Sequence, residues 1–378
     1  MSGREQSQQG AMEPILFVDK VFLSPADGAP CGVEVFNLNL LKDLCALGYP
    51  MTVFAHGTWA DIVGKWGGGI PAEVIRLPMG SRDVTGCLLA SLAVARRRFA
   101  VLLLGNVGNR LIPAMAMLGL TGAARRAVLI AHREPMPRFV RALRRMPTAV
   151  LAVNQKIAGH FEGMGFAAVK VSYGITDAAR FHPPAGGKPD DGLVHFCVLG
   201  HLDRKWKGAD TAIAAFRQLP EALRRRCRLH LAAYDRPPAF SEPEIIAYPW
   251  LPFEQMGDFL RKMDVMLVPS RDEEVMRETF SQAVVQGMLT RLPAIVSALP
   301  VLTEKVDEGG GLVFRDVPEC AQAMERLASD PALRADMGAK ARRTALARYV
   351  WNTRAFAEEF LFPGTGSGEP RSLQGGHS

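Results

Sequence analysis

Short apolar runs recur along this 378-residue chain, and segments with helical spacing of apolar residues lie between them. Each run is rich in Val, Ile and Leu and is continuous rather than alternating, which is typical of strands buried on both faces of a parallel sheet. Strands that alternate with helices predict an α/β, doubly wound fold. The runs are 14–18, 51–55, 74–77, 101–104, 127–131, 149–153 and 169–173, followed by 194–199, 228–233, 245–248, 265–268, 294–297 and 311–314.

A segment rich in proline, glycine and charge, residues 184–191, separates two roughly equal sets of runs. Such a composition marks a linker between domains. We therefore predict two Rossmann-like domains, residues 14–183 and 192–351, that face each other across a cleft. Residues 1–13 and 363–378 lack apolar patterning and are predicted to be disordered.

The composition indicates a globular protein, because 48% of the residues are hydrophobic and 22% are charged. No stretch approaches the roughly 20 apolar residues that span a bilayer. The first residues lack the apolar core of a signal peptide. The six cysteines are scattered, without a Cys-x-x-Cys pair, which indicates reduced thiols in a cytosol rather than a zinc site or disulfide framework.

The net charge of +7 comes largely from clusters of arginine. No aromatic residues interleave these clusters in a stacking pattern, so nucleic-acid binding is a weaker interpretation than attraction to anionic lipid head groups. Residues 137–146 have two open interpretations. The segment is either a surface helix packed on its sheet or a membrane-surface patch near a lipid-linked acceptor. Its apolar residues near one helical face are Phe139, Val140, Leu143 and Met146, with arginines around the rest.

Residues 264–293 hold the most informative local pattern. The apolar run 265–268 stops at Pro269, a polar acidic loop follows, and a helix is predicted to open at residues 278–281. Thr279 and Ser281 can cap its first turn, whose free N–H groups and positive dipole end suit an anion. Glu278 lies at the start of this predicted helix, where its carboxylate can accept hydrogen bonds from hydroxyl groups. An anion beside a polyol is what a sugar phosphate or nucleotide sugar presents.

A second loop, after the run 194–199, carries Lys207 and Gly208 just before a predicted helix that opens at residues 210–211. The glycine admits close backbone approach and the ammonium adds charge, which together suit a diphosphate. The alternative is a solvated basic turn. Because ligands bind beyond the carboxyl ends of parallel strands, this loop and the Glu278 loop are expected to face one cleft.

The first half of the chain offers weaker signals. Gly32, Val33 and Glu34 form a glycine turn at the start of a predicted helix, and its plain alternative is a flexible loop between a strand and a helix. His132 follows directly after the run that ends at Ala131. A single histidine is often a structural residue, but a position at the carboxyl end of a strand favours a role in binding.

The order of residues in 264–293 resembles the donor-site motif of the retaining family 4 glycosyltransferases, which have the GT-B fold. The family pattern is Pro-Ser, Glu-x-Phe-Gly, a second Glu, and later Gly-x-Pro. The spacing from Glu278 to Gln286 fits, although Gln286 replaces the second Glu and Ser281 replaces the Gly. The matching residues are Pro269, Ser270, Glu278, Phe280, Ser281, Gln286, Leu292 and Pro293.

The resemblance extends over about residues 14–362 and is strongest over 194–351. His201 stands where the family usually has an arginine that binds the diphosphate, and Arg204 or Lys205 could take its place. Further matches to the family are Gly200, Lys207 and Gly208 in the basic loop, residues 173–175 and 181–183 at the crossover between domains, and residues 349–351 before a last helix, 352–362, that returns to the first domain.

The resemblance implies a retaining hexosyltransferase that moves a sugar from a nucleotide diphosphate sugar to a saccharide or lipid-linked acceptor. It also implies a role in polysaccharide or envelope glycan assembly, no metal or other cofactor, and a cytoplasmic location with peripheral membrane contact left open. The catalytic residues would be Glu278, Lys207 and His132. The donor-binding residues would be Gly32, Val33, Gly200, His201, Arg204, Gly208, Thr279, Phe280, Ser281 and Gln286.

Two other functions stay open at this point. A non-catalytic partner subunit that binds a nucleotide sugar would explain the departures at His201, Ser281 and Gln286. A sugar-nucleotide epimerase on the same architecture would form an epimer without any acceptor.

Overall fold

The computed structural model describes residues 12–26, 30, 32–77, 84–106, 108–134, 137–166, 169–171, 177–188, 190–272 and 278–363. The described residues divide into two compact units. The first unit holds the residues up to 171 together with 352–363, and the second holds 177–351. The segments predicted to be disordered lie outside the described residues, apart from Met12, Glu13 and Pro363.

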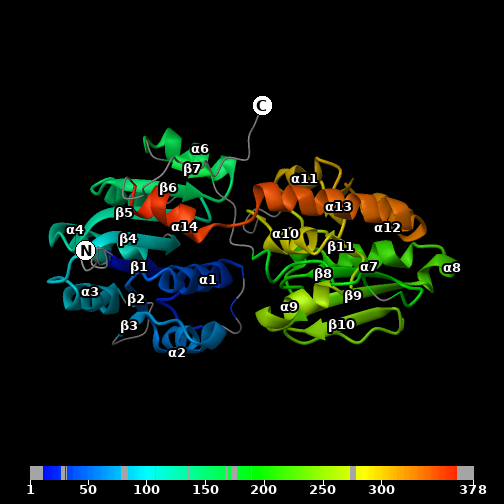
Figure 1. Cartoon of the computed structure of the whole chain (residues 1–378), viewed down its shortest axis with the longest axis horizontal. Helices are drawn as coiled ribbons and strands as arrows, with labels where there is room; N and C mark the ends of the chain where they lie inside the picture. Colours follow the sequence, from blue (N-terminus) through cyan, green and yellow to red (C-terminus); the bar gives the residue numbers. More distant parts are fainter. Residues whose placement is uncertain are drawn as a thin grey trace, which may run out of the picture. The chain divides into compact units, whose positions relative to one another are not determined.

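The first unit is built on a parallel sheet in the order β3-β2-β1-β4-β5-β6-β7 (Figure 1). Its strands are β1 (Ile15–Asp19), β2 (Met51–Ala55), β3 (Glu73–Arg76), β4 (Phe99–Asn106), β5 (Ala124–Ala131), β6 (Thr148–Ala152) and β7 (Val169–Val171). Its helices are α1 (Val33–Ala46), α2 (Gly57–Lys65), α3 (Val84–Ala93), α4 (Ile112–Leu120), α5 (Pro137–Leu143), α6 (Gln155–Gly163) and α14 (Thr353–Phe356), with the short turns η1 (Trp66–Gly68), η2 (Asn109–Leu111) and η4 (Ala357–Leu361).

The second unit has a parallel sheet in the order β10-β9-β8-β11-β12-β13 (Figure 1). Its strands are β8 (Val194–Leu199), β9 (Cys227–Tyr234), β10 (Ile245–Pro249), β11 (Val265–Val268), β12 (Ala294–Ser297) and β13 (Gly311–Phe314). Its helices are α7 (Ala209–Arg217), α8 (Glu221–Arg224), α9 (Phe253–Leu260), α10 (Gln282–Leu289), α11 (Pro300–Val306), α12 (Val317–Ser329) and α13 (Pro331–Arg348), with the short turn η3 (Lys205–Lys207).

Both strand orders are those of a Rossmann-like, doubly wound sheet, so the predicted α/β class with two such units is confirmed. Every apolar run of the sequence overlaps a strand, and β2, β8, β11, β12 and β13 agree with the runs residue for residue. The described part of the run 169–173 ends at Val171, and its last two residues lie outside the described part.

The continuous apolar runs are explained by burial from both sides. All residues of β4 are buried, and in the second unit the two sheet faces carry separate hydrophobic clusters. One cluster includes Phe216 of α7 and Met324 of α12, and the other includes Met288 of α10 and Ala341 of α13. Because helices cover both faces, polar chemistry is left to the loops at the carboxyl ends of the strands.

The boundary between the units differs from the predicted linker at residues 184–191. The described residues 177–183 already belong to the second unit, because Phe181 is fully buried in its core and contacts the ring of Phe253 at 6.0 Å between centroids. The part of the predicted crossover at residues 173–175 lies outside the described residues.

The end of the chain returns to the first unit. The hydroxyl of Thr353 donates to Asp43 on α1 at 3.0 Å, and the ring of Phe362 stacks on Tyr49 with centroids 5.2 Å apart. The segment from α14 to Phe362 therefore packs as part of the first unit rather than the second.

The arginine-rich segment around α5 packs on the first unit. Its apolar side chains are buried in that unit's core, and its arginines are exposed. This burial favours the surface-helix interpretation, because the apolar face is already covered by protein and is not available to a bilayer. Among the described residues, no helix is both long and apolar enough to span a membrane. The buried residues are Phe139, Val140, Leu143 and Met146.

A pair of glycine substitutions tests the packing of α13. A Cβ at Gly338 would lie 2.2 Å from the carbonyl oxygen of Arg291, so Gly338→Ala should destabilise the protein by about 1–3 kcal/mol through overpacking. A Cβ at Gly159 in α6 would meet nothing within 4 Å, so Gly159→Ala should be neutral or stabilise by up to about 1 kcal/mol. Denaturant unfolding of both variants checks this, and a Gly338→Ala variant as stable as the Gly159→Ala control would contradict the packing.

Candidate active site

The candidate site lies where the strand order of the second sheet reverses. β8 and β11 are neighbours in the sheet, although the chain continues from β8 to β9 on one flank and from β11 to β12 on the other. The chain therefore leaves the carboxyl ends of β8 and β11 in opposite directions along the sheet. Open parallel sheets bind ligands at such a point. Lys207 is in the loop after β8, and Glu278 is in the loop after β11.

The two loops are held against each other by backbone contacts. Gly208 has φ +70°, and a Cβ there would lie 2.0 Å from the carbonyl oxygen of Pro269. The backbone N–H of Arg271 donates to the carbonyl of Trp206 at 2.7 Å. The guanidinium of Arg271 also pairs with Asp210 at 2.8 Å. Glycine suits position 208 because the left-handed backbone disfavours a side chain and the Pro269 carbonyl leaves no room for one.

The structure brings Lys207 and Glu278 into direct contact. The Lys207 Nζ atom lies 2.7 Å from Glu278 Oε2, and the two side chains are only 16% and 9% exposed. The hydroxyl of Ser270 donates to the same carboxylate oxygen at 3.2 Å, and the ammonium lies 4.2 Å from the centre of the Trp206 ring. A cation and a carboxylate predicted to act on one donor are therefore neighbours in a sheltered position.

The predicted start of the helix after Glu278 is wrong. α10 begins at Gln282, and Ser281 is its N-cap residue, so residues 278–281 precede the helix. The predicted capping is also wrong for Ser281, because its side chain makes no cap hydrogen bond and its Oγ has no partner among the described residues. Thr279 lies two residues before the N-cap. The reason is the backbone of Ser281, whose φ of 61° and ψ of 79° differ from the extended conformation of capping serines.

This backbone explains a departure from the family pattern. The left-handed region favours glycine, and Ser281 stands where the family motif has glycine. A serine held there costs on the order of 1–3 kcal/mol, and such strained positions cluster at functional sites. The residue type has changed while the glycine-like backbone is kept. The first-turn N–H groups of α10 consequently receive no hydrogen bond from the Ser281 side chain.

A buried lysine that the sequence reasoning missed lies behind this segment. Lys305 on α11 is 0% exposed, and its ammonium contacts the ring of Phe280 at 4.7 Å and the ring of Tyr349 at 5.3 Å. It donates to the carbonyl of Val301 at 2.7 Å. Burial lowers the pKa of Lys305, while the charges of Glu304 and Glu278 oppose this shift. Phe280, two residues after Glu278 in the chain, thus contacts both this cation and the ring of Tyr349, whose centroid lies 6.1 Å away.

The other predicted donor-binding residues of the second unit differ in their surroundings. Gly200 has φ +130°, and the stem of Lys207 passes 3.3 Å from where its Cβ would be. His201 packs edge-on against Trp250 with centroids 4.4 Å apart. Burial, and then the charge of Arg204, lowers the pKa of His201, so its ring is neutral at pH 7. Arg204 is exposed, and Gln286 is buried within α10.

His132 lies in the first unit just after β5 and is buried. Its ring packs edge-on against Phe36 of α1 at 4.9 Å, and its Nε2 atom has no hydrogen-bond partner among the described residues. Burial, assisted by the charge of Arg133, lowers the pKa of His132 to about 3. The imidazole is therefore neutral. Gly32 forms the N-cap of α1 with φ 48°, and Val33 is the first helical residue.

Sequence reasoning also missed an acid in the first unit. Asp19 ends β1, is fully buried, and accepts hydrogen bonds from the Asn37 side chain at 2.6 Å and the backbone N–H of Val21 at 2.5 Å. Burial raises the pKa of Asp19 to about 7. The only signal in the sequence was a single aspartate at the end of an apolar run, which does not distinguish a buried acid from a solvated one.

The described residues offer charged groups to a ligand. Among them, no group of three or more His, Cys, Asp or Glu side chains is arranged to hold a metal ion. The second unit instead combines an ammonium, a carboxylate and a helix start whose amides lack a side-chain cap. Such a combination can bind an anion through Lys207 and the helix dipole, and hydroxyl groups through Glu278.

Residues 194–330 match the family model described as glycosyl transferases group 1. This range contains β8, β11 and α10, and so contains Lys207 and Glu278. No curated protein matches the sequence significantly.

Solved structures with the same fold span nearly the whole chain. The Anabaena protein Alr3699/HepE in complex with UDP has a TM-score of 0.68 at 16% identity, with 92% of this chain and 98% of that chain covered. Sucrose-phosphate synthase from Thermosynechococcus elongatus has a TM-score of 0.67 at 16% identity, with 92% and 97% covered. A glycosyltransferase from Rickettsia africae ESF-5 has a TM-score of 0.73 at 14% identity, with 94% and 100% covered. The matched domain and the shared fold together support a glycosyltransferase enzyme with the GT-B architecture.

Proposed function

We propose that this chain is a retaining glycosyltransferase of family 4 that uses a nucleotide diphosphate sugar as donor. The observation that carries the proposal is the Lys207–Glu278 contact of 2.7 Å beside the start of α10. The contact brings a cation that would bind the diphosphate next to a carboxylate that would bind the sugar. Both lie in the loops after β8 and β11, where the strand order reverses. The Anabaena protein is solved with UDP and with UDP-glucose, which supports a UDP-sugar as the donor.

The diphosphate would meet Lys207 and the first-turn N–H groups of α10. A helix N-terminus and a lysine each favour a nearby anion, and the Ser281 hydroxyl does not occupy the amides. Gly208 lets the Lys207 loop lie against Pro269, and Gly200 lets the stem of Lys207 pass close to its backbone. Arg204 would add charge from the exposed side of the same loop, whereas His201 would act as a neutral hydrogen-bonding group.

The transfer step needs charge compensation more than a protein nucleophile. The bond between the sugar's anomeric carbon and the diphosphate oxygen breaks, and the acceptor hydroxyl oxygen bonds to the same face of that carbon. Because the new bond forms on the face from which the diphosphate departs, configuration is retained, and the leaving diphosphate takes the acceptor's proton. Lys207 stabilises the negative charge that grows on the leaving group, and preorganised groups of this kind contribute a few kcal/mol each.

The remaining site residues receive roles from the resemblance. Glu278 would accept hydrogen bonds from hydroxyls of the transferred sugar, Gln286 would hydrogen-bond the ribose, and the neutral His132 would contact the sugar. The acceptor would be a saccharide or lipid-linked saccharide in polysaccharide or envelope glycan assembly. A similarly folded structure, WaaG, is described as involved in lipopolysaccharide biosynthesis, which supports this class of acceptor. The proposed scheme needs no metal, and we expect the reaction to take place in the cytoplasm.

Donor binding should be visible as thermal stabilisation. A ligand at 100 times its Kd stabilises the folded state by about 2.7 kcal/mol, which raises the melting temperature. Among UDP-, GDP- and ADP-sugars, we expect a UDP-sugar to raise it most, because it should bind most tightly. Lys207→Ala should weaken this binding by about tenfold or more, since a charged hydrogen bond is lost. Lys262→Ala, which removes an exposed lysine of the same unit outside the proposed donor site, is the matched control. Equal shifts for both variants would contradict the role of Lys207.

Glu278→Gln should separate binding from transfer. Without its carboxylate, Lys207 loses its ionic partner, so UDP should bind more tightly while sugar transfer falls by about 10²-fold. Lys207→Ala should instead weaken binding and transfer together. Titration calorimetry with UDP and a transfer assay on both variants check this contrast. A wild-type protein that binds UDP but turns over no donor would indicate a non-catalytic binding subunit, and epimer formed without acceptor would indicate an epimerase.

A further inference from the structure

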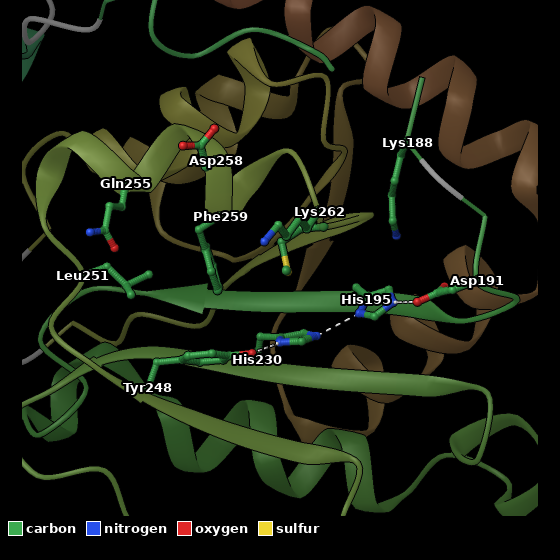
Figure 2. Close-up of a pocket in the computed structure, with 11 residues that line it drawn as sticks. Lys188, Asp191, His195, His230, Tyr248, Leu251, Gln255, Asp258, Phe259 and Lys262 are labelled. Carbon is green, nitrogen blue, oxygen red and sulfur yellow. Dashed lines mark hydrogen bonds and ion pairs between the residues drawn. The ribbon is translucent and has the colours of Figure 1, made fainter. Parts of the chain in front are cut away.

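A pocket of about 660 Å³ lies in the second unit, apart from the residues of the proposed donor site. It is formed between α9 and the strands β8, β9 and β10 (Figure 2). Its volume falls in the range of small-molecule sites. None of its lining residues belongs to the Lys207 loop or to the segment that begins at Glu278.

A row of four side chains crosses the floor of this pocket (Figure 2). Asp191 Oδ2 lies 3.0 Å from His195 Nε2, His195 Nδ1 lies 2.8 Å from His230 Nε2, and His230 Nδ1 lies 2.9 Å from the hydroxyl of Tyr248. With both histidines neutral, all these hydrogen bonds are satisfied when each group donates toward Asp191. The reverse order would place a bare His195 Nε2 against a carboxylate, so this direction is favoured.

The row gives the pocket a floor of three rings that are tilted to one another. The rings of His195 and His230 are tilted by 31° with centroids 5.1 Å apart, and those of His230 and Tyr248 by 22° at 5.8 Å. Phe259 of α9 stands edge-on to Tyr248 at 77°. Because the polar ring atoms are already hydrogen-bonded to one another, a ligand would meet ring faces and edges here rather than free donors.

Polar groups line the rim above this floor. The exposed Gln255 lies on α9, and the exposed Lys262 lies two residues after its end. Neither side chain makes a hydrogen bond or ion pair with the described part of the chain, so both are available to a ligand. The Gln255 amide both donates and accepts, and the ammonium of Lys262 donates.

The charges around the pocket are mostly paired with one another. Lys188 pairs with Asp264 at 2.5 Å, Asp258 pairs with Arg261, and Asp191 is bound by His195. A phosphate-bearing ligand would find Lys262 as the one pocket-lining ammonium without an ionic partner among the described residues. This arrangement favours an uncharged ligand over a nucleotide.

We propose that this pocket binds a saccharide chain at a site separate from the donor. A pyranose ring has one C–H face, which suits an aromatic floor, and a rim of hydroxyls, which suits an amide and an ammonium that both hydrogen-bond. The volume accommodates more than one sugar unit. If the proposed transfer function holds, a second saccharide site on the same chain would raise the effective concentration of an acceptor glycan.

A glycan array tests the proposal with the full-length protein, independently of turnover. The wild type should bind at least one immobilised oligosaccharide, and Gln255→Ala/Lys262→Ala should weaken that binding by about tenfold or more. Glu254→Ala, an exposed change on the same helix outside the pocket, and Lys207→Ala should both bind like the wild type. Absence of any bound glycan, or equal binding by the double variant, would overturn the proposal.

A probe inside the pocket locates the binding. Met263 lines the pocket, so its methyl resonance in protein labelled with ¹³C-methyl methionine should shift when the array-selected oligosaccharide is added. Met263→Leu assigns that resonance. A shift produced by UMP and not by the oligosaccharide would refute the saccharide site in favour of a nucleotide site. If the protein binds a glycan at the pocket but transfers no sugar, the proposed function is wrong. The inference of a saccharide site would still hold.

Discussion

The ion pair between Lys207 and Glu278 is the interaction on which the candidate site depends. Both side chains are largely buried, so each needs the other to offset the cost of leaving water. The pair can form only because Gly208 lets its loop lie against Pro269. A nucleotide diphosphate would compete with Glu278 for the ammonium. The pair links the two loops of the site, and Lys207 would share its charge between Glu278 and a bound anion.

The sheet could be predicted because its strands are buried on both faces. Continuous runs of Val, Ile and Leu leave little ambiguity, and runs such as 194–199 and 265–268 coincide with β8 and β11. The start of α10 could not be predicted, because capping serines usually have an extended backbone and Ser281 does not. Lys305 gave no signal either, since a lysine among ordinary helical residues is expected in solvent.

Contacts between residues on different strands could not be predicted from local sequence patterns either. His195, His230 and Tyr248 lie on three neighbouring strands, and each alone is an unremarkable residue of an apolar run. The segment 137–146 shows a different limit, because one sequence pattern there fitted two interpretations. Its apolar spacing fitted both a packed helix and a membrane patch, and only the burial of residues such as Phe139 and Leu143 distinguishes the two.

Two of the departures from the motif of the resembled family, at Ser281 and His201, differ in their consequences. Ser281 has a left-handed backbone, the conformation that glycine favours, so a glycine would fit before α10 equally well. His201 keeps neither the charge nor the fork of the arginine it replaces, because burial against Trp250 holds it neutral. The proposed diphosphate contacts therefore depend more heavily on Lys207. A site with fewer fixed cations holds its leaving group less strongly, which would ease the release of the nucleotide product after transfer.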